Sequence, residues 1–159
     1  MTAKTSKKNS PSDGRPPLAQ RRKARRLVLQ ALYQWQMTQD SVADIEAQFR
    51  AEYQGKYDWD YFHELFSVIP GQVEQLDHLL AAHLDRAVSA LDPVERALLR
   101  MGAFELSQRI DIPYRVVINE AVELAKVFGA TDGHKYVNGI LDRLAKDLRA
   151  AETHGTAGI

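Results

Sequence analysis

Apolar residues recur at helical spacing along most of this chain, in amphipathic segments separated by polar stretches or by Gly and Pro. The first segment, from about Leu18 to Met37, carries an apolar stripe at intervals of mostly three and four residues: Ala24, Val28, Ala31, Leu32 and Trp35. Strand signals are scarce, because β-branched runs are short. The pattern predicts an all-α fold of six or seven helices.

Helix-start signals divide the later segments. Asp92-Pro93-Val94-Glu95 combines an N-cap Asp, a Pro at the first helical position and an acidic residue in the first turn. Ser41 and Asp58 are predicted to cap earlier helices, and Thr131 or Asp132 to cap the last one. Pro70 interrupts an otherwise continuous pattern, which predicts either one long kinked helix or two helices that meet there.

The two ends of the chain lack this pattern. Residues 1–17 are rich in Lys, Ser, Pro and Gly and predict a disordered basic arm, while residues 153–159, with two glycines, predict a flexible tail. The helical domain is therefore expected over residues 18–152. A chain of 159 residues has room for one domain, or for two small subdomains that share a core.

The charge distribution is asymmetric although the formal net charge is zero. Residues 1–26 hold nine basic side chains and one acidic one, so this part carries +8 and the remainder −8. A basic segment on an acidic body is typical of a protein that meets a polyanion, and the alternative is a solubilising tail that folds against its own body. The absence of cysteines, of a membrane-length apolar run and of a signal-peptide core predicts a cytoplasmic protein without disulfides.

The sequence contains none of the common enzyme motifs, such as phosphate-binding loops, nucleophile elbows or the H-E-x-x-H zinc motif. His78 and His83 lie five positions apart on a helix, which is too far around its axis for both to bind one metal ion. We therefore expect no catalytic residue, no metal and no cofactor.

The first helix carries the strongest functional signal. Arg22, Arg26, Leu29 and Tyr33 are spaced to share one face, and further cations surround them: Arg21, Lys23 and Arg25. Cations neutralise phosphates and an exposed ring stacks on an unpaired base, so the helix predicts binding of single-stranded nucleic acid. The alternative for Tyr33 is a ring packed in the core.

A weaker signal begins the last helix, where Lys135 and Tyr136 follow the turn at residues 131–133. Backbone N–H groups at a helix N-terminus favour phosphate.

Several of these segments resemble the NusB family of transcription antitermination factors. The similar segments are Arg22–Arg26 with Gln30–Trp35, Ile112–Lys126, Phe128–Ala130 and Lys135–Asp142. They occur in the family's order and cover about Gln20 to Leu148.

The resemblance implies a NusB-like fold of two small helical bundles packed across one another, and a protein that is not an enzyme. It implies binding to the boxA element of nascent RNA, notably in ribosomal RNA leaders, together with the ribosomal protein NusE, and assembly with other Nus factors on RNA polymerase. By motif position, the expected RNA contacts are Arg21, Arg22, Arg25, Arg26, Tyr33, Lys135 and Tyr136. Glu95 and Asp132 are expected near the partner surface.

Two other functions stay open at this point. One is an RNA-modifying protein, since a similar helical domain is fused to ribosomal RNA cytosine methyltransferases, although this chain has no room for a cofactor domain. The other is a protein-interaction bundle without an RNA function.

Overall fold

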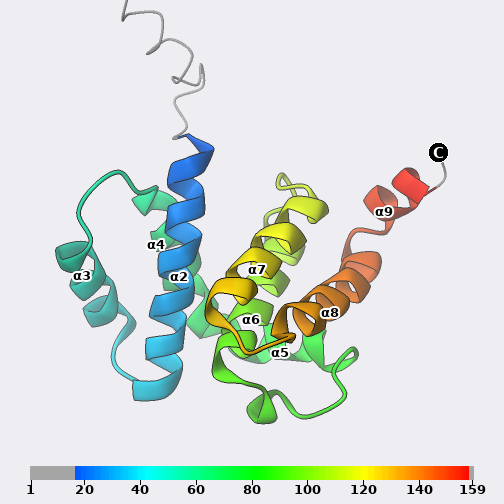
Figure 1. Cartoon of the computed structure of the whole chain (residues 1–159), viewed down its shortest axis with the longest axis horizontal. Helices are drawn as coiled ribbons and strands as arrows, with labels where there is room; N and C mark the ends of the chain where they lie inside the picture. The colour runs from blue at the N-terminus through cyan, green and yellow to red at the C-terminus, as the bar shows by residue number, and fades with distance from the viewer. Residues whose placement is uncertain (1–16, 158–159) are drawn as a thin grey trace, which may run out of the picture.

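A computed structural model describes residues 17–157, which form helices and no strand, as the all-α prediction requires. The predicted disordered arm lies, apart from Pro17, outside the described residues. The helices, labelled as in Figure 1, are α2 Leu18–Thr38, α3 Val42–Glu52, α4 Trp59–Val68, α5 Val73–Ala81, α6 Pro93–Gln108, α7 Tyr114–Phe128, α8 Gly133–Leu148 and α9 Ala150–Ala157, with short 3₁₀ turns η1 Ile69–Gln72 and η2 Val88–Ala90.

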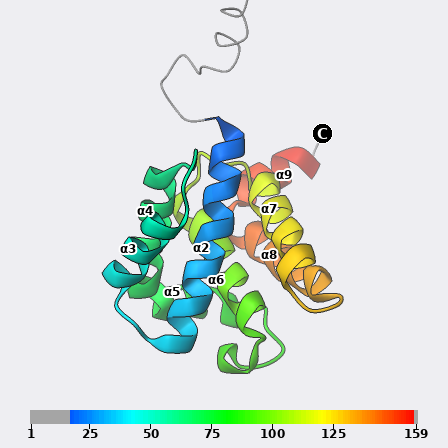
Figure 2. The ribbon, with the colours of Figure 1, turned by 60° about the vertical axis from the view of Figure 1, so that its left-hand side comes forward.

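The helices form two groups that meet at α2 and α6. Helix α2 packs against α3 and α4, while α6 packs against α5, α7 and α8, and the α2–α6 contact joins the groups (Figures 1 and 2). Helix α6 is buried on nearly all sides, from Met101 through Leu106. A helix that is buried all round is expected at the centre of a fold, and this arrangement confirms the two-bundle prediction.

The predicted caps explain where several helices begin. Asp92 accepts hydrogen bonds from two backbone N–H groups in the first turn of α6, and Pro93 occupies the first helical position. Ser41 and Asp58 cap α3 and α4 in the same manner. Asp132 stands at the cap position of α8 in the left-handed region, with φ of 67°, but its side chain makes no capping hydrogen bond.

The interruption at Pro70 separates two helices. Helix α4 ends at Val68, a 3₁₀ turn follows, and α5 begins at Val73. Pro70 supplies no backbone N–H, so an uninterrupted α-helical ladder is impossible there. The apolar pattern continues across the break because Ile69 and Leu76 are both buried.

The C-terminal segment differs from the prediction of a flexible tail that begins at Thr153. Helix α9 extends to Ala157, and Thr153 itself is buried. Arg149 is the physical reason, because its buried guanidinium donates to backbone carbonyls of α6 and to Glu152. Glu152 in turn accepts a hydrogen bond from the Tyr114 backbone N–H at 2.9 Å.

Candidate nucleic-acid interface

Arg25 lies in the interior, although the sequence pattern places it among the exposed cations of α2. Its Nε donates to Glu105 Oε2 of α6 at 2.9 Å, and only 5% of the residue is exposed. The Tyr61 hydroxyl of α4 donates to the same carboxylate, and burial together with that carboxylate raises the pKa of Tyr61 well above its usual range. The expectation of an exposed Arg25 is therefore wrong, because Arg25 faces the α2–α6 contact.

Arg21 also holds α2 to its neighbour. Its Nε lies 3.6 Å from Asp58 Oδ2, and its guanidinium lies 4.3 Å from the centre of the Tyr61 ring. Only 19% of the side chain is exposed. Asp58 therefore both caps α4 and pairs with a cation of α2, so Arg21 offers only an edge to solvent.

Three cations of α2 remain at the surface, and we call them the cationic strip: Arg22, Lys23 and Arg26. The Arg22 side chain is 72% exposed, and its guanidinium lies 3.1 Å from a carboxylate oxygen of Glu120 on α7. The Arg26 guanidinium lies 5.1 Å from the centre of the Phe128 ring. An ion pair with such an exposed partner contributes little to stability, so Arg22 is available to exchange Glu120 for a phosphate.

Tyr33 lies two turns beyond Arg26 on α2 and is 41% exposed, which disagrees with the alternative of a fully packed ring. Leu29, predicted on the same face, is buried with 2% exposure. The solvent-exposed face of α2 is therefore narrower than the sequence spacing predicts, because α4 and α6 cover the other sides of the helix.

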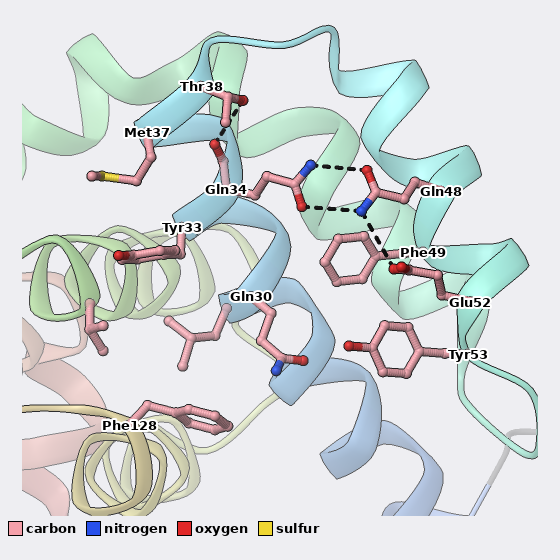
Figure 3. A pocket seen from close by; sticks show the side chains of 12 residues that line it. Gln30, Tyr33, Gln34, Met37, Thr38, Gln48, Phe49, Glu52, Tyr53 and Phe128 are labelled. Atoms are coloured by element: carbon pink, nitrogen blue, oxygen red, sulfur yellow. Dashed lines mark hydrogen bonds between the residues drawn. The ribbon is translucent and has the colours of Figure 1, made fainter.

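A cavity of about 580 Å³ crosses the exposed face of α2 beside Tyr33 (Figure 3). Its floor is α2, one wall is α3, and the other wall is formed by Val94 and Phe128. Glu52 is the only charged residue that lines it among the described residues. We call this space the α2–α3 cavity, and its lining is Leu29, Gln30, Tyr33, Gln34, Met37, Thr38, Gln48, Phe49, Glu52, Tyr53, Val94 and Phe128.

Phe128 connects the cationic strip to this cavity, a role that sequence reasoning missed. The periodicity of α7 assigns Phe128 to the core, but the ring is only half-buried. It lies beneath the Arg26 guanidinium and lines the cavity together with Tyr33. The available sequence signal is its position at the very end of α7, where a helix leaves the core.

The second predicted patch, at the start of α8, is tied to the loop after α5 rather than to α2. The Tyr136 hydroxyl donates to Asp85 Oδ1 at 3.0 Å, and the Arg86 guanidinium lies 4.9 Å from the centre of the Tyr136 ring. Arg86 also donates to both oxygens of Asp85, at 2.8 and 3.1 Å, and these hydrogen bonds together with that from Tyr136 lower the pKa of Asp85 to about 2. Lys135 is 73% exposed and lies 3.4 Å from Asp132.

The two residues expected near the partner surface differ in exposure. Glu95 is only 8% exposed and packs against the first residue of α8, Gly133, where a side chain would meet its carboxylate. Burial, reinforced by the nearby Asp92 carboxylate, raises the pKa of Glu95. Asp132 is well exposed, so only this residue presents most of its side chain to solvent.

Other features of the described residues point to neither a metal nor a membrane. No three His, Asp or Glu side chains in residues 17–157 are arranged to hold a metal ion. Within the same residues, no helix has the length and apolar composition needed to cross a bilayer.

The chain is similar to known proteins along most of its length. The model of the NusB family matches residues 22–146. The transcription antitermination protein NusB of Alcanivorax borkumensis is 61% identical over 133 residues, which cover 83% of this chain and 89% of that protein. The solved structure of T. maritima NusB has a TM-score of 0.69 at 33% identity, covering 79% of this chain and 89% of that one. A structure of antitermination factors NusB and NusE in complex with dsRNA has a TM-score of 0.71 at 25% identity, and the match covers 79% of this chain and 96% of that one.

Proposed function

Because the chain belongs to the NusB family, we infer that it is a transcription antitermination factor and not an enzyme. We propose that it binds boxA-type RNA of nascent transcripts together with NusE and joins other Nus factors on RNA polymerase in the cytoplasm. A structural relative in complex with NusE and double-stranded RNA supports the binding of NusE and of RNA, while the preference for a single strand rests on the surface of this chain. The observation that carries it is the arrangement of the cationic strip, Phe128 and Tyr33, in which Arg26 lies over the Phe128 ring and Phe128 lines the same cavity as Tyr33.

This surface suits a single strand of RNA. Arg22, Lys23 and Arg26 supply cations for phosphates, and the half-exposed Tyr33 ring supplies a platform for an unpaired base. A duplex keeps its bases stacked inside, so it leaves Tyr33 without a partner. We therefore propose the single strand as the preferred form, and exclude the buried Arg25 from the proposed contacts.

A second contact is proposed at the start of α8, where the exposed Lys135 exchanges its ion pair with Asp132 for a phosphate and Arg86 stacks on Tyr136. We propose that NusE docks beside this region, with exposed Asp132 contacting the partner directly. In this proposal Glu95 does not contact NusE, but packs against Gly133 and positions the first turn of α8.

Equilibrium binding to matched RNAs tests the proposed function. Three RNAs are compared by fluorescence anisotropy with and without NusE: a boxA-type single strand, a scrambled strand and the boxA strand paired in a duplex. We expect the boxA strand to bind most tightly, and more tightly with NusE. If the protein binds NusE but retains none of the RNAs, it is an interaction bundle without an RNA function.

Variants locate the contact surface. Arg22→Ala and Arg26→Ala should each weaken binding to all RNAs and reduce the slope of log K against log salt by about 0.7. Tyr33→Ala should cost about 1–3 kcal/mol of RNA binding, as expected for one stacked base. Lys146→Ala is the matched control, because Lys146 is exposed on α8 away from the strip. Equal losses in the control and the strip variants would remove the strip from the mechanism.

A further inference from the structure

The α3 side of the α2–α3 cavity holds polar groups without partners. Within residues 17–157, the Gln30 side-chain amide and the Tyr53 hydroxyl make no hydrogen bond, although both residues are half-buried. Figure 3 shows the two groups directed toward the same space between α2 and α3. These solvent-accessible groups have no bond within the protein to break, so both are open to a ligand that supplies complementary donors and acceptors.

The neighbouring polar groups of this wall are already engaged. The amides of Gln34 and Gln48 bond to each other at 3.0 and 3.5 Å, and Gln48 also donates to Glu52 at 3.4 Å. These bonds fix the upper part of the wall, as Figure 3 shows. The Gln30 amide and the Tyr53 hydroxyl are therefore the groups left to bind a ligand.

The chemistry of the wall favours a heteroaromatic ring. The Phe49 and Tyr53 rings are stacked, with centroids 5.5 Å apart, and both line the cavity, so the half-buried Tyr53 ring has an aromatic neighbour behind it. No cation lines the described cavity, and Glu52 would repel a phosphate. A nucleobase satisfies both conditions, because it is flat and carries hydrogen-bonding groups along its edge, which glutamine amides read well.

We propose that the α3 side of the α2–α3 cavity binds one unpaired base of the RNA, with Gln30 and Tyr53 bonding to its edge. The same cavity reaches Tyr33 on the other side of α2, so the neighbouring base occupies the proposed stacking site. The bound strand then crosses α2 toward α3 beyond the cationic strip. This inference rests on the proposed RNA-binding function and adds a base-specific subsite to it.

A coupling experiment tests the subsite. A series of boxA-type RNAs, each with one abasic nucleotide, is titrated against the full chain and against the double variant Gln30→Leu/Tyr53→Phe. These substitutions remove the polar groups and keep side chains of similar size. The matched control is Gln75→Leu/Tyr114→Phe, since Gln75 is exposed on α5 and the half-buried Tyr114, at the start of α7, does not line the cavity.

One abasic position should weaken binding to the unaltered chain by about tenfold and binding to the double variant by no more than about twofold. The control variant should behave like the unaltered chain. Tyr53→Phe alone should show part of the effect, which keeps the test valid if the double variant folds poorly.

Three outcomes overturn the subsite. If every abasic position weakens RNA binding to the unaltered chain and to the double variant equally, no base binds between Gln30 and Tyr53, although the proposed RNA-binding function stands. If the double variant loses NusE affinity without RNA, the cavity binds the protein partner. If the unaltered chain binds no RNA, the subsite and the proposed function fail together.

Discussion

Replacing Arg25 with methionine should destabilise the protein strongly while leaving its RNA surface intact. The substitution removes the cation that faces the Glu105 carboxylate, which is only 2% exposed. The Tyr61 hydroxyl remains as a donor, but the negative charge stays buried without a counter-charge. Removing one partner of a buried ion pair costs about 3–5 kcal/mol, and we expect the free energy of unfolding to fall by that amount.

Urea unfolding followed by far-ultraviolet circular dichroism measures this loss, with Arg22→Met as the matched control. Arg22 is highly exposed, so its substitution should change the free energy of unfolding by no more than about 1 kcal/mol. RNA affinity should show the opposite order. Arg22→Met should weaken binding, whereas the folded fraction of Arg25→Met should bind RNA like the unaltered chain.

Two results would refute this reasoning. One is a loss of stability below about 1 kcal/mol in Arg25→Met, which would mean that the buried pair is not a structural contact. The other is an RNA affinity in Arg25→Met that falls as far as in Arg22→Met. Adding Glu105→Gln to Arg25→Met should restore part of the lost stability, because the substitution removes the uncompensated buried charge.

Three further predictions concern the core. The pKa of Tyr61 is raised in the folded state, so the free energy of unfolding should be constant below about pH 10 and fall above it. In urea unfolding at a series of pH values, Tyr61→Phe should make this fall shallower by up to about 1.4 kcal/mol per pH unit. Gly102→Ala should lower the free energy of unfolding by about 1–3 kcal/mol, since the new Cβ would lie 2.7 Å from a core leucine of α8. In the control Gly71→Ala the new Cβ meets nothing within 4 Å, and the free energy of unfolding should change by no more than about 1 kcal/mol. Arg149→Ala should lower the free energy of unfolding by about 3 kcal/mol, through lost bonds to carbonyls of α6, and Lys146→Ala by less than about 0.5; equal midpoints for the two would contradict the structure.

Helix starts were predictable because they depend on local chemistry. Asp92, Ser41 and Asp58 each cap the helix that the sequence assigns to them, and the cap needs only the residues of one turn. The C-terminal helix was not predictable in this way. Its contacts depend on Arg149, whose partners are carbonyls some forty residues earlier in the chain.

The candidate site was predicted as a region but not residue by residue. Spacing correctly placed Arg22, Arg26 and Tyr33 toward solvent, because those positions lie opposite the apolar stripe. It failed for Arg25, whose burial requires a carboxylate from α6. It also failed for Phe128, because periodicity does not indicate where a helix end emerges from the core.

Two cations of α2 form ion pairs within the protein and three are proposed to bind RNA, and the ion pairs determine which side of the helix faces the RNA. Arg21 pairs with Asp58 of α4 and Arg25 pairs with a carboxylate of α6, so α2 is held on two sides. Successive residues of a helix are separated by about 100° around its axis, and a rotation of that size would exchange Arg25 with Arg26. Such a rotation would bury Arg26 at the α2–α6 contact and turn Arg22 and Tyr33 away from the face where RNA is proposed to bind. The buried ion pairs therefore fix the face of α2 that presents the cationic strip and Tyr33, which is why stability and RNA affinity should respond to different arginines of one helix.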